Sequence, residues 1–575
     1  MTDTLSIALA QLSSRVGDIA GNLALARRAR AEAARLGAEL VLFPELFLVG
    51  YPPEDLVLKP ALQEACRLAI HELAQETGDG GPAVLIGTPW REAGKLHNAV
   101  ALLEEGRIAT LRFKVDLPNY GVFDEKRVFT PGPMPGPISF KGVRIGVPIC
   151  EDIWGEDIVE CLSETGAELL LVPNGSPFRR TVRDERTQTV VARIAESGLP
   201  VAYLNRVGGQ DELVFDGASF GLNADYGLAF QLQAFVETVA LTRWQRTSAG
   251  WACVEGGKAS LPEGHAQTYT AAMVGLRDYV EANRFPGVVL GLSGGIDSAL
   301  VAALAADALG PSRVRCVMLP YRYTAQISLD DAKLCANRLG CPYEIIPIAP
   351  AVEGFLAALG PALTGTSPDI TEENLQSRAR GTILMALSNK FGGMVVTTGN
   401  KSEMSVGYAT LYGDMNGGFN PIKDIYKTEV YELARWRNAH VPAGALGPDG
   451  EVIPLNIIER APSAELRENQ TDQDSLPPYE VLDAILHGLV EEERPIAEIV
   501  AQGFDIATVK RIEHLLNIAE YKRRQAAPGV KISTRNFGRD RRYPISHGFR
   551  DPGTPINPSD DTNILFQPRI NAVDV

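Results

Sequence analysis

The sequence has few cysteines and no long apolar run. Its seven cysteines are spread over 575 residues without regular spacing, which excludes a disulfide framework. No apolar stretch approaches the roughly 20 residues that a membrane helix needs. The N-terminus also lacks the basic region and apolar core of a secretory signal. We therefore expect a cytoplasmic protein with no membrane partner.

Basic residues are also in deficit. The chain has 55 Lys and Arg against 71 Asp and Glu, a formal net charge of −16 at pH 7. Broad nucleic-acid binding needs a basic surface, so we expect no nucleic-acid partner, although a local basic patch can still bind a phosphate ligand. The length exceeds what a single core usually fills, so two or more domains are expected.

A glycine- and serine-rich stretch lies in the middle of the chain, between an apolar run at 285–290 and a helix-like run at 299–306. A strand, a glycine-rich turn and a helix start make an anion site, because free N–H groups at the helix start point at the ligand. The predicted ATP-binding residues of this loop are Gly291, Leu292, Ser293, Gly294, Gly295, Ile296, Asp297 and Ser298.

Asp297 is an unusual residue in a phosphate-binding loop. A carboxylate repels phosphate unless a cation lies between them, so the loop indicates a Mg²⁺–polyphosphate site with Asp297 as a metal ligand. No Gly-Lys-Ser/Thr follows, which excludes a Walker loop, and the dinucleotide fingerprint is absent. A plain strand–helix turn is the simpler alternative. The ordered string resembles instead the pyrophosphate loop of the ATP pyrophosphatases, which cleave ATP between the α and β phosphates.

The first half of the chain alternates short apolar strands with helical patterns, which predicts a layered α/β domain with a mixed sheet. Three residues lie at predicted strand ends, where such folds place their chemistry. They are Glu45, Lys114 and Cys150. Each alone has an ordinary explanation as a surface charge or a small core residue.

Together with their flanking motifs, these three residues resemble the nitrilase superfamily. The resemblance implies a four-layer αββα sandwich over residues 1–255 and a Cys-Glu-Lys catalytic triad. The residue types suit amide hydrolysis, because a thiolate attacks, a carboxylate accepts the thiol proton and an ammonium group stabilises the oxyanion. Glu125 resembles a second glutamate that many members keep near the nucleophile.

The motifs at 117–125 and 174–178 look like the glutaminase branch of that superfamily. The resemblance implies that Tyr120 and Ser176 contact glutamine. The family usually has Gly-Lys or Gly-Arg six residues after this serine, whereas Thr181 and Val182 occupy the positions here. Arg183 or Arg180 is the candidate replacement for the basic contact.

We place a linker at 256–267 and a second domain at 268–575, whose alternating pattern predicts a doubly wound parallel sheet of the ATP pyrophosphatase type. The motifs at 398–403, 421–428 and 462–466 resemble NAD synthetases. The resemblance implies a glutamine-dependent enzyme that adenylates the carboxylate of deamido-NAD with ATP and lets ammonia displace AMP. It also implies a homo-oligomer, an octamer in bacterial members.

The same resemblance assigns the remaining site residues. Thr398, Lys427 and Ser463 join the loop at the ATP site; Asn374, Glu403 and Lys522 contact deamido-NAD; and Glu403 shares Mg²⁺ with Asp297. The basic tail between Lys522 and Arg542 has three readings: binding RNA, pairing with acidic patches of the enzyme, or reaching the dinucleotide phosphates. The overall acidity weakens the first.

Rival functions stay open at this stage. One is a synthetase that uses only free ammonia. Another is an ATP pyrophosphatase amidotransferase with a different acceptor, such as a tRNA-modifying enzyme. A third is a non-catalytic scaffold, which the intact triad disfavours.

Overall fold

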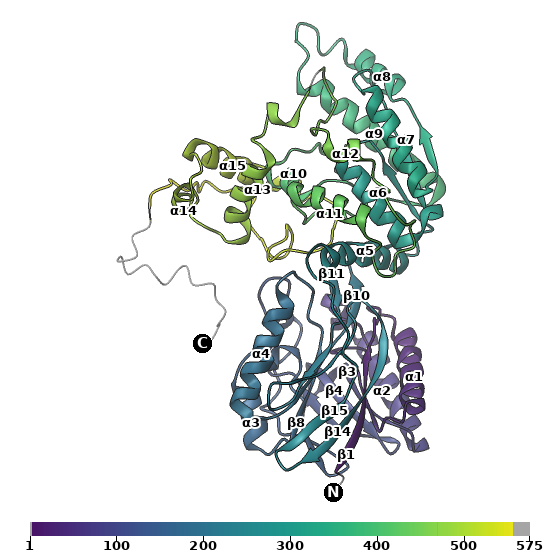
Figure 1. Ribbon diagram of the computed structural model, residues 1–575, viewed down its shortest axis with the longest axis vertical. Helices are drawn as coiled ribbons and strands as arrows, with labels where there is room; N and C mark the ends of the chain where they lie inside the picture. Colours follow the sequence, from purple (N-terminus) through teal and green to yellow (C-terminus); the bar gives the residue numbers. More distant parts are fainter. Residues whose placement is uncertain (1–2, 469, 556–575) are drawn as a thin grey trace.

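The computed structural model describes residues 3–468 and 470–555. The chain forms two lobes that follow each other in sequence (Figure 1). The predicted second domain ends at residue 575, and positions 556–575 lie outside the described residues. No helix in the described ranges is both long and apolar enough to cross a membrane.

Two mixed sheets build the first lobe. The larger runs in the order β15-β14-β1-β2-β3-β4-β5, with bounds Gly250–Glu255, Thr238–Thr247, Thr4–Gln11, Leu40–Leu42, Ala83–Glu92, Lys95–Glu104 and Arg107–Phe113. The smaller runs in the order β13-β12-β9-β8-β7-β6, with bounds Leu228–Gln231, Phe220–Leu222, Val201–Asn205, Leu169–Asn174, Val143–Gly146 and Ile138–Phe140. Their inner faces share one apolar core, to which β1, β2, β7 and β8 contribute.

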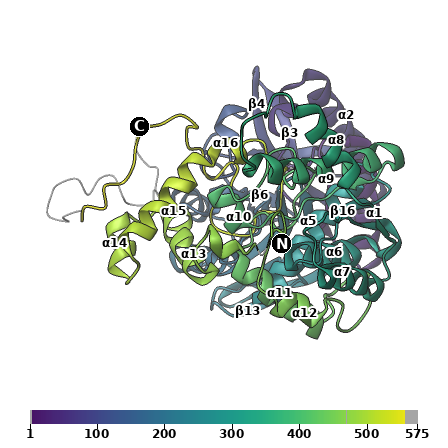
Figure 2. The same ribbon diagram turned by 90° about the horizontal axis from the view of Figure 1, so that it is seen from above.

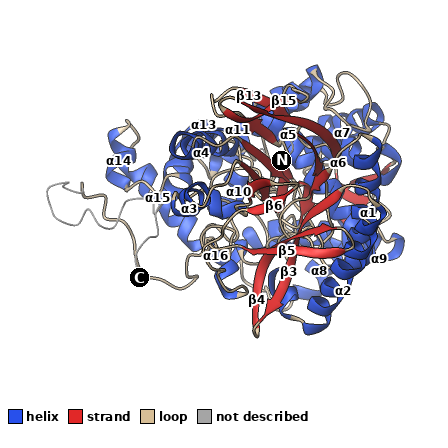
Figure 3. Ribbon diagram, turned by 90° about the horizontal axis from the view of Figure 1, so that it is seen from below, coloured by secondary structure: helices blue, strands red, loops and turns tan. Residues whose placement is uncertain are grey.

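Helices cover the outer face of each sheet (Figure 3). Helices α1 (Ile19–Arg35) and α2 (Pro60–Glu76) pack on the larger sheet, and α3 (Asp157–Glu164) and α4 (Val182–Ser197) pack on the smaller one. The predicted four-layer αββα sandwich is therefore confirmed. Helix α1 begins directly after Asp18, which caps it. Asn22 in its first turn is buried and donates to the Leu48 carbonyl at 2.9 Å.

The second lobe contains a parallel sheet in the order β18-β17-β16-β19, with bounds Tyr343–Ile345, Val314–Met318, Val288–Gly291 and Met394–Val395. One face packs against α5 (Gly264–Ala282), α6 (Ile296–Leu309), α7 (Gln326–Leu339) and α11 (Lys427–Ala439). The other face packs against α8 (Ala349–Leu359) and α9 (Ile370–Phe391). This confirms the doubly wound sheet. Its strand order reverses at β16, and ligands of such sheets bind at the reversal, beyond the strand ends.

A smaller helical group extends to one side of this sheet (Figures 1 and 2). It consists of α10 (Lys401–Val406), α13 (Tyr479–Leu486), α14 (Ile496–Ala501), α15 (Ile506–Ile518) and α16 (Glu520–Arg523). Helix α12 (Leu455–Glu459) packs beside α6 and α11 instead. Helix α10 of this group follows the carboxyl end of β19 after a short loop, and it carries Glu403, one of the predicted site residues.

The lobes meet where α5 packs on the hairpin of β10 (Val207–Gln210) and β11 (Leu213–Asp216) (Figure 1). The Gly209 amide donates to Asp278 of α5 at 2.6 Å. A Cβ at Gly275 would lie 2.5 Å from Val530 and 3.0 Å from Val214, so only glycine permits this approach. Helix α5 begins at Gly264, inside the predicted linker, and leads into β16 and the glycine-rich loop.

Candidate active sites

A buried lysine forms the centre of the first site. The Lys114 ammonium lies 2.7 Å from Glu45 and 3.0 Å from Glu125, and its side chain has no exposed surface. Burial opposes a charge on Lys114, but the carboxylates of Glu125 and Glu45 raise the pKa of Lys114 well above its ordinary value. The lysine is therefore a permanent cation beside the nucleophile, as stabilising an oxyanion requires.

Three further groups orient Glu45 and Glu125. Asn98 donates to Glu45 at 2.7 Å, and the Tyr51 hydroxyl donates to Glu125 at 2.8 Å. The Gly175 amide donates to the second oxygen of Glu45 at 3.0 Å. The sequence motifs did not single out Tyr51 or Asn98. For Asn98, the available signal was a polar residue directly before the apolar run at 99–103 of β4.

Cys150 lies at a sharp bend directly after the apolar run that contains β7. Its φ of +50° is in the left-handed region, which non-glycine residues adopt at a cost and which clusters at functional sites. Burial and the nearby Glu45 raise the pKa of Cys150 well above that of a free thiol, against the opposing charge of Lys114. Cys150 is thus a thiol at rest, and a base would have to remove its proton for the sulfur to act as a nucleophile.

Asp152 fixes the geometry of this bend. Its carboxylate accepts from the Ile149 amide at 2.9 Å, and from Val115 and Asp116 at 3.0 and 2.8 Å. One side chain therefore ties the segment that carries the nucleophile to the segment that follows Lys114. The structure brings together Glu45, Lys114 and Cys150, as the sequence predicted, and adds Asp152 as a residue that positions two of them.

The two predicted glutamine contacts differ in their surroundings. The Tyr120 hydroxyl donates to Glu151 at 2.9 Å, next to the nucleophile, and about half of this side chain is exposed. Ser176 is buried, and its hydroxyl accepts from Arg186 at 3.0 Å. Tyr120 is thus partly exposed beside Cys150, whereas Ser176 is buried and held by Arg186.

The suggested replacements for the missing basic contact are both engaged elsewhere. Arg183 pairs with Asp216 at 2.9 Å and donates to the Pro262 carbonyl at 2.6 Å. Arg180 forms an ion pair with Glu429 of the other lobe. The arginine that contacts Ser176 is Arg186, which the motif reading did not weigh. A replacement by Arg183 or Arg180 therefore has no support in these contacts.

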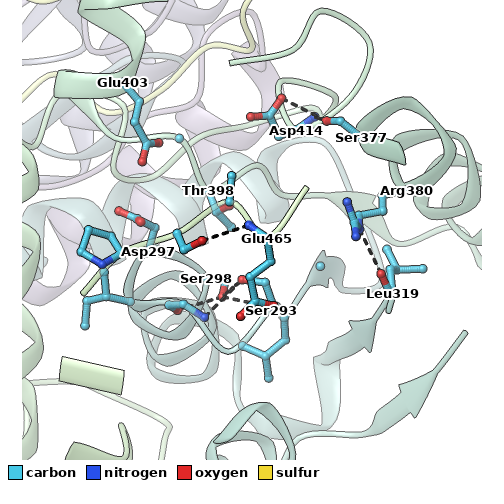
Figure 4. Close-up of a pocket in the computed structure, with 18 of the residues that line it drawn as sticks. Ser293, Asp297, Ser298, Leu319, Ser377, Arg380, Thr398, Glu403, Asp414 and Glu465 are labelled. Atoms are coloured by element: carbon cyan, nitrogen blue, oxygen red, sulfur yellow. Dashed lines mark hydrogen bonds between the residues drawn. The ribbon is translucent and has the colours of Figure 1, made fainter. Parts of the chain in front are cut away.

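The second site is an open cavity of about 340 Å³ beyond the carboxyl ends of β16 and β19. It lies at the strand-order reversal described above. Figure 4 shows Asp297 and Glu403 on one side and Arg380 on the other. Thr398, Lys427, Ser463 and every residue of the glycine-rich loop except Gly294 line this cavity. Their assignment to ATP stays a prediction.

The glycine-rich loop is held by its own serines. The Ser298 hydroxyl accepts from the Ser293 amide at 3.2 Å and donates to the Gly295 carbonyl at 3.0 Å. Gly294 has a φ of +80°, and a Cβ there would lie 2.4 Å from the Ser328 carbonyl oxygen. The loop is therefore a tight turn into α6, whose N-terminus faces the cavity.

A lysine also joins two carboxylates in this cavity. Lys427 forms an ion pair with Asp297 and lies 3.3 Å from Glu403, and only 2% of its side chain is exposed. Asn400 donates to Asp297 at 2.9 Å and caps α10, on which Glu403 lies one turn later. Burial raises the pKa of Glu403 to about 8.

The donor set suits Mg²⁺. Two carboxylates converge on one point, and Mg²⁺ commonly binds one or two carboxylates together with substrate phosphates and water. Among the described residues, no group of three or more His, Cys, Asp or Glu side chains is placed to hold a metal ion. Residues Asp297 and Glu403 therefore fit an ion that arrives with ATP better than a permanently bound one.

Asn374 and Lys522 do not line the cavity. Asn374 accepts from the Thr410 hydroxyl at 3.0 Å, and Lys522 donates to the carbonyls of Gly407 and Ala409 at 2.7 Å each. Both side chains thus hold the segment 407–410, whose Tyr408 and Thr410 do line the cavity. Their assignment to deamido-NAD stays a prediction.

Many residues that line the cavity were not among the predicted contacts, and Arg380 and Glu465 are two of them. Arg380 donates to the Leu319 carbonyl at 2.9 Å, and burial lowers its pKa to about 10. Glu465 has a φ of +49° and accepts from the Ser328 hydroxyl at 2.6 Å. This hydroxyl does not cap α7, which begins after Ala325. Glu465 belongs to the motif at 462–466, but nothing local in the sequence indicated that it faces the same cavity as Arg380.

The basic tail pairs with groups of the enzyme itself. Arg524 and Arg541 each lie 3.0 Å from Glu520. Lys531 pairs with Asp540, and Arg539 pairs with Glu54 of the first lobe. Of the three readings, these contacts support pairing with acidic groups.

Comparisons with known proteins follow the same two-lobe division. The Carbon-nitrogen hydrolase family matches residues 6–251, and the NAD synthase family matches residues 268–526. A glutamine-dependent NAD(+) synthetase of Rhodobacter capsulatus is 54% identical, covering 96% of this chain and 100% of the relative. The chain belongs to the glutamine-dependent NAD(+) synthetase family. The resemblance found in the motifs is thereby confirmed, and the chain is a ligase-family enzyme rather than a scaffold.

More distant relatives agree. A glutamine-dependent NAD(+) synthetase of Thermotoga maritima is 43% identical, covering 95% of this chain and 99% of the relative. A solved glutamine-dependent NAD+ synthetase of Acinetobacter baumannii, in complex with ADP, is 42% identical, with a TM-score of 0.75 and coverage of 94% and 98%. Because these full-length relatives share both domains, the family favours glutamine-dependent NAD synthesis over an ammonia-only enzyme or a different acceptor.

Proposed function

We propose that residues 1–255 release ammonia from glutamine at Cys150, and that residues 268–575 use it to convert deamido-NAD into NAD with ATP. The division places the linker at 256–267. The observation that carries the proposal is the pair of sites in one chain. A buried Cys-Glu-Lys cluster lies in one lobe, and a cavity at the sheet reversal with a glycine-rich loop lies in the other.

In the first domain, Glu45 accepts the Cys150 proton as sulfur attacks the amide carbon of glutamine. Lys114 stabilises the oxyanion, and its position between Glu45 and Glu125 keeps it charged. The tetrahedral intermediate then expels ammonia, which takes the proton from Glu45 and leaves a thioester. Water, deprotonated by Glu45, cleaves the thioester and releases glutamate. Tyr120 and Ser176 contact the substrate.

In the second domain, the carboxylate of deamido-NAD attacks the α-phosphorus of ATP, and pyrophosphate leaves. Ammonia then attacks the adenylated carbonyl carbon, and AMP leaves. The loop amides, Ser293, Thr398, Lys427 and Ser463 bind ATP, while Asn374, Glu403 and Lys522 serve the dinucleotide. When bound, Mg²⁺ on Asp297 and Glu403 would neutralise the polyphosphate charge.

One assay tests both halves. NAD formation is measured from deamido-NAD, ATP and Mg²⁺, with glutamine or with ammonium, for wild type and Cys150→Ala. The variant should lose the glutamine-driven reaction by about 10³-fold or more and keep the ammonium-driven one. Equal glutamine activity in both proteins would refute the role of Cys150. If wild type makes no NAD from either donor, the synthetase proposal fails.

We also propose a cytoplasmic homo-oligomer, an octamer by family resemblance. All seven cysteines are free, which suits a reducing compartment. Helix α8 has Val352 as its only buried residue, and its Phe355 is 42% exposed. Ile370 (67%) and Phe391 (59%) are exposed at opposite ends of α9. We propose the α8 face as the contact with a second copy, because it leaves a large apolar side chain in solvent. Light scattering of Phe355→Glu should show a smaller assembly than wild type, and an unchanged mass would exclude this face.

A further inference from the structure

The segment 529–543, called here the strap, leaves the second domain and reaches the first. Its root is built on Asp424, which accepts from the amides of Ile532 and Ser533 at 2.7 Å each. The Asn420 amide donates to the Pro528 carbonyl at 2.8 Å, just before the strap begins. The strap therefore starts as a part of the second-domain core.

A buried lysine connects this root to the ATP cavity. Lys401 lies 2.7 Å from Asp424 and donates to the Ser533 hydroxyl and the Arg535 carbonyl at 2.7 Å each. It is fully buried. Its neighbour in sequence, Asn400, donates to Asp297 at 2.9 Å. The position of the strap is thus tied to the residues around the predicted metal ligands.

The root of the strap also makes backbone hydrogen bonds to the first domain. The Lys531 amide donates to the Glu212 carbonyl at 2.8 Å, and the Arg180 amide donates to the Ile532 carbonyl at 3.2 Å. These two bonds do not depend on side-chain identity. They bring the strap beside the hairpin that also receives α5, so the strap and α5 contact the same part of the first domain.

The far end of the strap contacts the loop 118–125. Arg542 donates to the Gly121 carbonyl at 3.2 Å, and Arg539 pairs with Glu54. The Glu54 side chain is also 3.8 Å from Arg127, just beyond the loop. Gly121 follows Tyr120, and the loop ends at Glu125, which contacts the catalytic Lys114.

We propose that Arg539 and Arg542 are positioning residues for the glutaminase reaction. By holding Glu54 and Gly121, they fix the loop that carries Tyr120 and Glu125 in the arrangement that binds glutamine. This inference rests on the proposed function. The second domain, through its strap, thus completes the glutamine site of the first.

The test uses the full-length double variant Arg539→Ala/Arg542→Ala. Both arginines are at the surface, with 43% of the Arg539 side chain exposed, so the variant should fold. Because exposed contacts of this kind are individually weak, we expect the KM for glutamine to rise about three- to tenfold. The kcat and KM with ammonium should stay at their wild-type values.

A matched control comes from the same segment. Arg535 pairs with Glu493, with side-chain exposures of 32% and 40%, but both residues belong to the second domain. Arg535→Ala should leave both reactions unchanged. In Arg539→Ala, the KM for glutamine should rise. In the exchanged pair Glu54→Arg/Arg539→Glu, it should return most of the way to the wild-type value, because the ion pair is restored with opposite polarity.

Two outcomes would overturn the proposal. If the double variant has the wild-type KM for glutamine, the contacts do not position the loop. If it loses activity equally with glutamine and ammonium, the strap only supports the fold of the second domain. Either result is distinct from a failure of the proposed function, in which wild type itself makes no NAD.

Discussion

Both active sites place a lysine between two acidic side chains, but the two lysines have different surroundings. Lys114 lies between Glu45 and Glu125, all three nearly without exposed surface. Lys427 lies between Asp297 and Glu403, whose side chains are 17% and 18% exposed to a cavity of about 340 Å³. The first arrangement is complete without a ligand. The second leaves its carboxylates accessible, so that a metal ion and phosphates can compete with the lysine.

Removing each lysine should separate the two sites most strongly. Lys114→Met leaves two carboxylates buried without a cation and should destabilise the first domain by about 3–5 kcal/mol. Lys427→Met should cost only about 1 kcal/mol, because water reaches its partners. Urea denaturation followed by circular dichroism measures both. If both variants lost the same free energy of unfolding, the carboxylates of the two sites would be equally shielded from water.

Asp297→Asn should then sharpen the comparison at the level of chemistry. The variant lacks one predicted metal ligand, so NAD synthesis should fall by about 100-fold or more with either nitrogen donor. Glutamate release by the first domain should be unaffected. Parallel assays of NAD and glutamate report the two sites, and Mg²⁺-dependent NAD synthesis at the wild-type rate would remove Asp297 from the metal site.

Gly175→Ala tests how closely the first site is packed. A Cβ at Gly175 would lie 2.7 Å from the Tyr51 ring and 3.1 Å from Glu45. Glutamine turnover should fall by about 10–100-fold through displacement of the base, with ammonium turnover retained. Gly257→Ala is the control, because a Cβ there meets nothing within 4 Å. If Gly175→Ala kept the wild-type kcat/KM for glutamine, the reaction would not depend on the exact position of Glu45.

The smallest expected effect concerns Glu151, beside the nucleophile. Burial raises its pKa from 4.5 to about 7, so between these values the folded protein holds more protons than the unfolded chain. Stability from this group is therefore lost as pH rises from 4.5 to 7. The free energy of unfolding should fall less between pH 5 and pH 8 in Glu151→Gln than in wild type, by about 1 kcal/mol. Urea denaturation at the two pH values measures this difference. Glu160→Gln, an exposed carboxyl on α3, should follow wild type.

The sequence predicted the residues whose chemistry is local to a motif. Glu45, Lys114 and Cys150 were proposed because their flanking motifs resemble those of the nitrilase superfamily, and the loop at 291–298 because strand, glycines and helix are contiguous. The alternation of short strands and helices predicted a layered α/β domain and a doubly wound sheet, and the four-layer arrangement came from the resemblance.

Contacts between distant parts of the chain were not predictable in this way. Arg539 and Glu54 are 485 positions apart, and nothing around either residue indicates the other. Asn98 and Asp152 form hydrogen bonds with residues that follow other strands, Glu45 for the first and Val115 and Asp116 for the second, and periodicity does not encode these contacts. Helix starts shifted for a similar reason: Ser328 follows an N-cap pattern, but its hydroxyl donates to Glu465 instead.

The strap has a consequence for how the chain can be divided. Its backbone hydrogen bonds to Glu212 and Arg180 run from the end of the sequence back to the first domain. Proteolytic cleavage in the linker at 256–267 would therefore break the chain without breaking this attachment. The two fragments should remain bound to each other, as two separately encoded subunits would, provided that the second fragment keeps residues 529–543.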